Sequence, residues 1–210
     1  MSKVTAEISM SLDGFVAGPN DGVDNGLGDG GERLHEWALR LRSWREAHGY
    51  EGGESGPDDE RFAAAIEAPG AIVMGRRMFD HGEGPWGEEP PFHKPVFVLT
   101  HRPREPLVKE GGTTFAFVED GIESAVAQAR EAAGDRDVAI AGGGQAIRQA
   151  IEAGLLDELE IHLVPVMLGG GVRLFDFDPA TAGRIDLEPI HAIDSPGVTH
   201  LRWRVGLGDA

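Results

Sequence analysis

The chain has 210 residues, 40% of them hydrophobic, which is enough to bury the core of one large domain. Its 36 acidic residues outnumber its 19 lysines and arginines, and the formal net charge of −17 argues against nucleic acids and anionic membranes as partners, because both are polyanions. The absence of cysteine excludes disulfides and thiolate metal sites.

The first expected element is a strand over residues 4–10, where the sequence VTAEISM is β-branched and alternating. Residues 1–10 lack the basic start and apolar core of a signal peptide. No apolar run approaches the roughly 20 residues that span a bilayer. We therefore expect a cytoplasmic protein.

Two glycine-rich segments are expected to be irregular. Residues 14–31, dominated by glycine, asparagine and aspartate, predict a long mobile loop, which is either a functional lid or an ornamental insertion. Residues 49–57 have the composition of an acidic linker with no packing face. After this linker, Asp58 or Asp59 is expected to cap a short helix that runs through Ile66.

Between these two segments, an amphipathic helix is expected over residues 32–48. Leu34, Trp37, Leu41 and Trp44 recur there at spacings of three and four. We interpret the two tryptophans as core anchors rather than as a pair that stacks on a ligand.

The middle of the chain repeats one theme, an apolar strand followed by a turn or a helix. Strands are expected over residues 71–74, 95–100, 113–118 and 138–141, and a helix over 122–133. Strands separated by helical segments imply a mostly parallel sheet with right-handed crossovers. The carboxyl ends of such strands share one edge, where open α/β sheets bind ligands.

The last third is expected to close the sheet. A helix over residues 146–154 precedes an alternating strand over 159–166, and the glycine-rich turn at 167–171 is interpreted as structural. Residues 185–193 and 199–205 flank the turn sequence DSPG and predict an antiparallel hairpin.

The hairpin strand over 199–205 is expected to alternate between core and solvent. Asp186 and Glu188 are expected to pair across the hairpin with its outward arginines, for roughly 0.2–1 kcal/mol each. The expected inward residues are Leu201, Trp203 and Val205, and the outward ones are His200, Arg202 and Arg204.

Three strand ends carry residues that suit phosphate binding. They are Gly75-Arg76-Arg77, Thr100-His101-Arg102 and Gly142-Gly143-Gly144. Glycine backbone can approach a pyrophosphate, and arginine forks can grip a separate phosphate. A dinucleotide with a 2′-phosphate fits this combination. The alternative is that the arginines lie at the surface and that the glycines only allow close packing of strand on helix.

Other ligand motifs are absent. The dinucleotide fingerprint G-x-G-x-x-G would need glycine in place of Ile147, and no G-x-x-x-x-G-K-[ST] sequence occurs. His81, Glu83 and His93 lack zinc-ligand spacing, so no metal is expected. No G-x-S-x-G sequence supports a serine hydrolase.

The order of these motifs resembles the dihydrofolate reductase-like fold. Within it, the chain is similar to the reductase (C-terminal) domain of bifunctional riboflavin-biosynthesis deaminase–reductases. The resemblance covers about residues 4–205 and rests on the sequences SLDGFVAG (11–18), VMGRR (73–77), VLT (98–100), GGGQ (142–145), LLDEL (155–159) and PVMLGGG (165–171).

This resemblance implies one α/β domain over residues 1–210. The implied fold has three layers, with a mostly parallel central sheet that a C-terminal antiparallel hairpin closes. It also implies hydride transfer from NADPH to a heterocycle such as a pteridine or a ribosyl-pyrimidine.

The resemblance further implies positions for the cofactor. Phosphate contacts are implied for Gly75, Arg76 and Arg77, and the adenosine 2′-phosphate is expected near Thr100, His101 and Arg102. The pyrophosphate is expected against Gly142, Gly143, Gly144 and Gln145, and the nicotinamide beside the backbone of Val16 and Ala17.

The substrate side is less defined. Folate-reducing members place a carboxylate at the start of their first helix, where Glu32 and Glu36 lie in this chain, with Asp29 nearby. Asp13 either contacts the substrate or only holds its own turn. No catalytic residue is assigned.

Three functions remain open at this point. The first is a stand-alone NADPH-dependent reductase, expected to be a homodimer that acts on a small molecule. The second is a nucleotide- or flavin-binding sensor. The third is a dimerising protein that has lost its pocket.

Overall fold

The computed structural model describes residues 2–208, so residues 1 and 209–210 of the expected domain lie outside it. Its main sheet contains β1 (Val4–Ser11), β3 (Pro69–Gly75), β4 (Pro95–Leu99), β5 (Leu107–Val108), β6 (Thr114–Val118), β7 (Asp137–Gly142), β8 (Glu158–Val164), β10 (Ile185–Ser195) and β11 (Val198–Leu207). A separate pair is formed by β2 (Phe15–Ala17) and β9 (Val172–Arg173). The helices are α1 (Glu36–Leu39), α2 (Arg42–Ala47), α3 (Pro57–Glu67), α4 (Arg76–Gly82), α5 (Gly121–Ala133), α6 (Gly144–Glu152), α7 (Pro179–Ala182) and the 3₁₀ turns η1 (Gly31–Leu34) and η2 (Glu110–Gly112).

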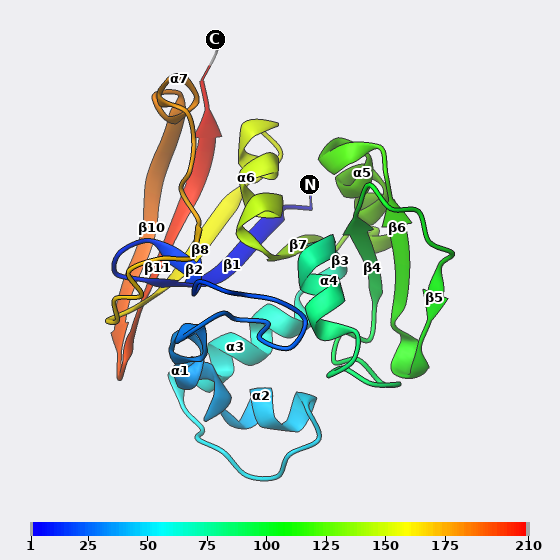
Figure 1. The fold of residues 1–210 in the computed structure, drawn as a ribbon, viewed down its shortest axis with the longest axis horizontal. Coiled ribbons are helices and arrows are strands. Elements are labelled where there is room, and N and C mark those ends of the chain that lie inside the picture. The colour runs from blue at the N-terminus through cyan, green and yellow to red at the C-terminus, as the bar shows by residue number, and fades with distance from the viewer. Residues whose placement is uncertain (1, 209–210) are drawn as a thin grey trace.

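The main sheet has the order β10-β11-β8-β1-β7-β3-β4-β6-β5. The six strands from β8 to β6 are parallel, and the β10–β11 hairpin adds antiparallel strands beside β8. Figure 1 shows this hairpin at the left of the sheet and β5 at the right. The expected fold class, a mostly parallel sheet with a C-terminal antiparallel hairpin, is confirmed. The short strand β5 was not expected.

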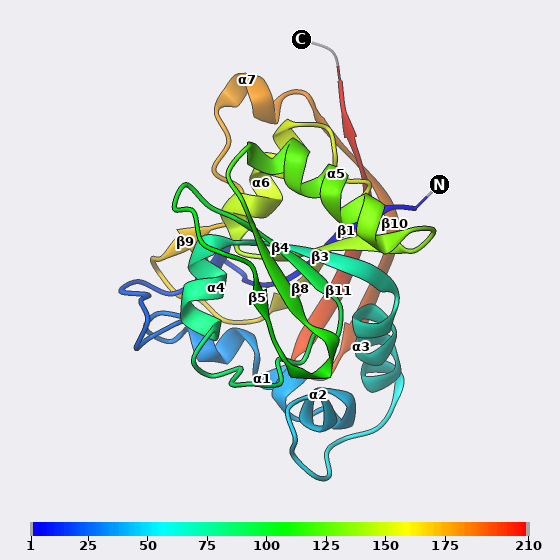
Figure 2. The same cartoon turned by 90° about the vertical axis from the view of Figure 1, so that its right-hand side faces the viewer.

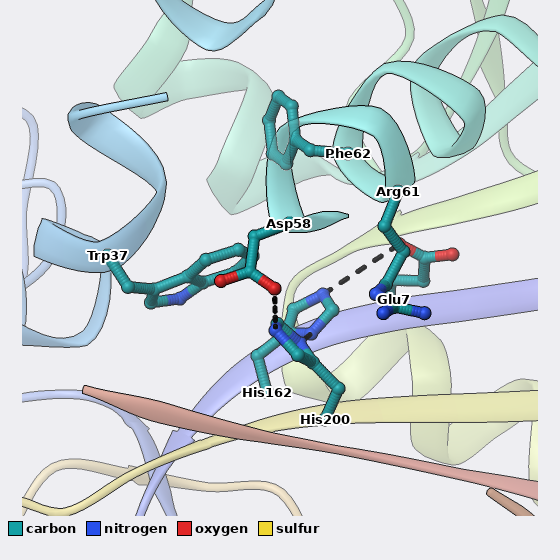
Figure 3. A pocket seen from close by; sticks show the side chains of 7 residues that line it. All are labelled: Glu7, Trp37, Asp58, Arg61, Phe62, His162 and His200. Carbon is teal, nitrogen blue, oxygen red and sulfur yellow. Dashed lines mark hydrogen bonds and ion pairs between the residues drawn. The ribbon is translucent and has the colours of Figure 1, made fainter. Parts of the chain in front are cut away.

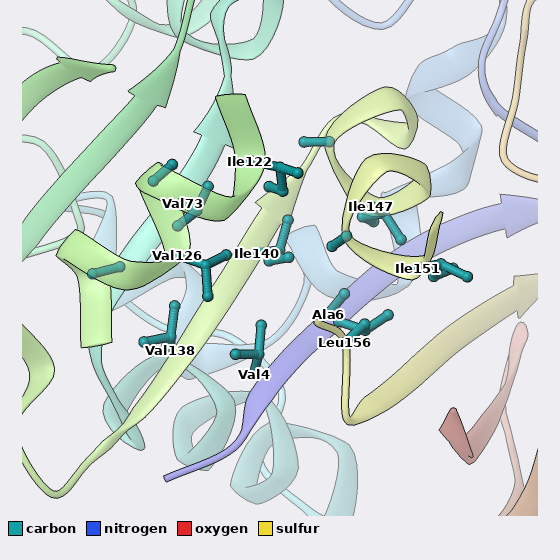
Figure 4. Close-up of a cluster of buried hydrophobic side chains, with 14 of the residues drawn as sticks. Val4, Ala6, Val73, Ile122, Val126, Val138, Ile140, Ile147, Ile151 and Leu156 are labelled. Atoms are coloured by element: carbon teal, nitrogen blue, oxygen red, sulfur yellow. The ribbon is translucent and has the colours of Figure 1, made fainter. Parts of the chain in front are cut away.

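Helices cover both faces of the sheet and complete the three layers. Within β3, Ala71 and Val73 face α5 and α6, whereas Ile72 and Met74 face the side of α4. Figure 4 shows the larger core, in which Val126 of α5 and Ile147 of α6 point toward the strands. In Figure 2, α5 and α6 lie toward the top of the view and α1 and α2 toward the bottom, with strands of the sheet between them. Within residues 2–208, no helix is long and apolar enough to cross a membrane.

Residues 14–31 contain more regular structure than the sequence predicted. The segment begins as β2, which pairs with β9, and the amide of Gly18 donates to the carbonyl of Leu27 at 2.8 Å. Gly171, interpreted as structural, packs against this segment: a Cβ there would lie 2.0 Å from the carbonyl oxygen of Ala17. The contact confirms a structural role for the turn at 167–171.

The expected continuous helix over residues 32–48 is wrong. The structure has η1, α1 and α2 there, because Leu41 is extended and bridges to Glu54. The amide of Arg42 donates to the carbonyl of Glu54 at 2.9 Å, so residues 49–57 do pack against the chain. Trp37 is buried as expected, whereas Trp44 is half-buried.

The expected cap on α3 is also wrong. Gly56, not Asp58 or Asp59, lies at the N-cap of α3. Asp59 is buried and accepts a hydrogen bond from the amide of Ser43 in α2 at 2.7 Å. Asp58 accepts from the Ser195 hydroxyl at 2.7 Å. These two carboxylates therefore tie α3 to α2 and to the hairpin.

The hairpin is confirmed, but two residues that were expected to face solvent do not: His200 is buried and Arg202 is half-buried. Arg204 pairs with Glu188 as expected. Arg202 instead donates to Glu158 and Glu160 on β8, at 2.8 and 2.9 Å, and His200 is completely buried. The reason is that α1 and α3 cover this face of β1, β8 and β11.

Candidate functional site

The carboxyl ends of β3 and β7 lie next to each other, and a helix starts directly after each. Met74 pairs with Gly142 in the sheet, Gly75 is the N-cap of α4, and Gly143 is the N-cap of α6. A Cβ on Gly75 would lie 3.7 Å from the amide nitrogen of Gly143. We call Gly75, Gly142, Gly143 and Gly144 the glycine edge.

The three consecutive glycines differ in their surroundings. Gly142 has a φ of 125° and is buried, and its peptide bond to Gly143 is cis. A Cβ on Gly144 would lie 3.2 Å from Cγ2 of Val16. Gly143 is exposed, with open space where its Cβ would be, and Gln145 after it is also exposed. Gly144 thus allows close packing, whereas Gly143 presents bare backbone to solvent at the start of α6.

The first two arginine-bearing turns are joined by a carboxylate, Asp80. Its two oxygens accept from Arg76 Nε and from Arg102 Nη2, each at 2.6 Å. Burial opposes ionisation of Asp80, but the hydrogen bonds and charges of these two arginines outweigh it and hold the pKa of the carboxyl below its ordinary value. Asp80 is therefore ionised and shares its charge between Arg76 and Arg102.

Thr100 fixes the turn after β4. It is buried, and its hydroxyl oxygen accepts from the amide of Arg102 at 3.0 Å and from Arg76 Nη1 at 3.3 Å. His101 is exposed. The structure thus brings the expected residues of these two strand ends together.

Two further arginines beside these turns are also paired. Arg77 forms an ion pair with Asp21, and Arg104 pairs with Glu83 at 2.6 Å. Four arginines therefore face three carboxylates, including Asp80, and leave one excess positive charge in a strongly acidic protein. Sequence reasoning did not identify any of the three carboxylates as a partner of these arginines. The spacing of Asp80 four residues after Arg76 on a helix was the signal that could have found one of them.

The residues expected on the substrate side are not gathered in one pocket. Glu32 and Glu36 are exposed. Asp13 accepts hydrogen bonds from the Ser11 hydroxyl at 2.6 Å and from the amides of Leu168 and Gly169 at 3.1 and 2.7 Å. The Ser11 hydrogen bond is the largest of the causes that lower the pKa of Asp13 to about 2. Its carboxylate thus holds the turn at 167–171.

A buried polar cluster lies between β1, β8 and β11 and the helices α1 and α3 (Figure 3). Its residues line a cavity of about 10 Å³, room for roughly one water molecule. We call it the histidine cavity; its lining residues are Glu7, Trp37, Asp58, Arg61, Phe62, His162 and His200.

Two histidines face each other in this cavity. His162 and His200 are paired across β8 and β11, and their Nδ1 atoms are 2.8 Å apart. Burial, followed by the neighbouring His162, lowers the pKa of His200. The Trp37 ring lies 4.7 and 5.1 Å from the two imidazoles, and its Nε1 donates to the Ser9 hydroxyl at 3.1 Å.

Sequence reasoning did not identify the histidine cavity. It predicted an alternating strand over residues 159–166, but it took His200 for a surface residue. The signal was present: a central strand of a parallel sheet is covered on both faces, so alternating polar residues in it must form a buried network.

Comparison with known proteins identifies the relatives of this chain. Residues 2–197 match the sequence profile of the RibD C-terminal domain. The uncharacterized protein YyaP of Bacillus subtilis (strain 168) is 25% identical over 183 residues, which cover 82% of this chain and 80% of YyaP. The uncharacterized protein YwjB of the same organism is 23% identical over 173 residues, 82% of each chain.

Solved structures share the fold, among them two that cover nearly the whole of this chain. One is a protein from Shewanella sp. PV-4 named for riboflavin biosynthesis, with a TM-score of 0.67 and 23% identity over 97% of this chain and 98% of that one. The other is dihydrofolate reductase from Enterococcus faecalis in complex with NADP(H) and RAB-propyl, with a TM-score of 0.54 and 15% identity over 99% of this chain and 97% of that one.

Proposed function

The chain belongs to the RibD C-terminal domain family, and on this premise we propose that it is an NADPH-dependent reductase of a heterocyclic small molecule, of the pteridine or ribosyl-pyrimidine kind. The observation that carries the proposal is the junction of the glycine edge with the arginine-bearing turns. Family and fold support reductase chemistry in general, and the cofactor and substrate are the proposed part.

The residues at this edge fit NADPH. Gly143 offers exposed backbone with open space above it, and the start of α6 adds the partial positive charge of a helix N-terminus. The side chains of Arg77 and Arg102 are 58% and 66% exposed, so solvent weakens their ion pairs. Each can therefore leave its carboxylate and bind a phosphate instead. Arg102, with His101, would hold the 2′-phosphate.

The protein's part in such a reaction is positioning. A bound nicotinamide supplies the hydride. Val16 packs against Gly144, so the backbone of Val16 and Ala17 lies where it can orient a ring seated beside the glycine edge. The pairing of β2 with β9 fixes that backbone.

One observation favours the alternative of a nucleotide- or flavin-binding sensor. Reduction of a heterocycle also needs a proton donor, and none of the expected carboxylates is placed as one. Asp13 holds a turn, and Glu32 and Glu36 face solvent. A sensor binds NADPH without oxidising it in any substrate screen. A reductase oxidises it with at least one heterocyclic substrate, which absorbance at the NADPH band detects.

We also propose a homodimer. The edge strand β10 exposes Leu187 and Ile190 by 41% and 43%, and an exposed apolar edge favours association. Sedimentation equilibrium tests this: a dimer has twice the chain mass of 22.4 kDa, and a monomer at all concentrations contradicts it.

A further inference from the structure

The two histidines of the histidine cavity are oriented in the same way. Their Nδ1 atoms face each other at 2.8 Å, and each ring turns its Nε2 toward a carboxylate (Figure 3). His200 Nε2 lies 3.4 Å from Asp58 Oδ1, and His162 Nε2 lies 3.7 Å from Glu7 Oε2. In metal sites, a ligating histidine commonly directs its other ring nitrogen to a carboxylate in this way.

Two neutral imidazoles cannot satisfy this arrangement. One Nδ1 must donate to the other, and the donating ring then presents a bare Nε2 to its carboxylate. The unsatisfied atom is buried: His200 is 0% exposed, and its Nε2 makes no hydrogen bond within the described residues. A cation between the Nδ1 atoms removes the conflict: both Nδ1 atoms then offer lone pairs, and both Nε2 atoms carry protons.

A third donor makes a metal ion, rather than a proton, the better cation. Glu160 lies two residues before His162 on the same face of β8, and ligand atoms of Glu160, His162 and His200 all lie within 4.8 Å of one another. Ligands on one tetrahedral ion are roughly 3.3 Å apart, so small side-chain rotations would bring them into place. A shared proton joins only two atoms.

The surrounding charges also admit a cation. Four carboxylates and three basic side chains surround the cluster, which leaves a net charge of −1 before any histidine is counted. The carboxylates are Glu7, Asp58, Glu158 and Glu160, and the basic side chains are Lys3, Arg61 and Arg202. Two imidazole nitrogens and one carboxylate oxygen suit Zn²⁺ and the borderline ions near it, not Ca²⁺ or Mg²⁺.

We propose that Glu160, His162 and His200 bind one divalent transition-metal ion of the Zn²⁺ class, through the two Nδ1 atoms and one carboxylate oxygen. Asp58 and Glu7 face the outer ring nitrogens at 3.4 and 3.7 Å. The ion joins β8 to β11 beneath α3, so its role is structural.

The test uses the full chain after dialysis against EDTA. Isothermal titration with ZnCl₂ is expected to give one site per chain and a higher Tm, and CoCl₂ is expected to give the visible absorption of a tetrahedral ion. His200→Gln removes the site, and Asp58→Asn weakens it by about 10–100-fold. His48→Gln, which changes an exposed histidine at the C-cap of α2, is the control and binds as the wild type does.

The outcomes decide the proposal even if a variant misfolds. Circular dichroism reports the folding of His200→Gln, and His162→Asn replaces it where needed. Wild-type protein that shows neither stoichiometric Zn²⁺ binding nor tetrahedral Co²⁺ absorption overturns the proposal without any variant. The proposal is also overturned if His200→Gln is folded and binds Zn²⁺ as tightly as the wild type. None of these readouts depends on NADPH or on a substrate.

Discussion

Arg102 donates to Asp80 at 2.6 Å, so the arginine expected to hold the 2′-phosphate is already ion-paired within the protein. Asp80 is shared with Arg76, whose guanidinium is much less exposed. The pairing positions both arginines beside the glycine edge, and it also competes with any phosphate. We therefore expect Asp80 to limit the affinity of this edge for anions.

Asp80→Asn is expected to strengthen NADPH binding. The substitution removes the competing charge and frees the Arg102 guanidinium, and an ion pair whose arginine is 66% exposed is worth up to about 1 kcal/mol, or roughly fivefold in Kd. Fluorescence titration measures the change. A Kd for NADPH that stays the same or rises contradicts this role of Asp80.

Gly143→Ala is expected to weaken NADPH binding without unfolding the protein. The Cβ enters open space at a negative φ, so stability changes by less than about 0.5 kcal/mol, but the methyl group covers the backbone that a pyrophosphate approaches. Gly84→Ala, also into open space, is the matched control and leaves binding unchanged. Equal NADPH affinity in the two variants argues against a pyrophosphate at Gly143.

Gly171→Ala is expected to destabilise the fold by about 2 kcal/mol or more, because its φ is 119° and its Cβ would lie 2.0 Å from the carbonyl oxygen of Ala17. Gly170→Ala meets no atom within 4 Å and is the control. Thermal unfolding compares the two variants. A similar Tm for both would show that the contact between residues 14–31 and the turn at 167–171 is loose.

Asp13 is expected to contribute to acid sensitivity. Its folded pKa of about 2 is below the ordinary 3.8, so the ionised carboxylate stabilises the fold above about pH 4, and this contribution is lost as the pH falls from 4 toward 2. Asp13→Asn lacks the contribution at every pH. The difference in Tm between wild type and variant therefore shrinks over that range; a constant difference contradicts the assignment.

The parts of the fold that follow from local pattern were predictable. The parallel strands appear as short apolar runs, and Gly142 to Gly144 end one of them. What failed depends on distant segments. Leu41 sits in a helical pattern, but its extended backbone is fixed by Glu54, and no local signal shows that bridge.

The same limit applies to the candidate sites. The arginines at Arg76 and Arg102 were identified from their places after strands, whereas the link through Asp80 needs α4 and the turn after β4 together. His200 was taken for a surface residue because alternation cannot say that α1 and α3 cover its face of the sheet. The histidine cavity arises only when these elements pack.

The central claim is that the glycine edge binds NADPH and that Arg102 recognises its 2′-phosphate. The most direct test is to titrate the wild type and Arg102→Ala with NADPH and NADH. The expected result is at least about tenfold tighter binding of NADPH by the wild type, with the preference lost in the variant and the NADH affinity unchanged. Equal affinity of the wild type for the two cofactors would contradict the claim.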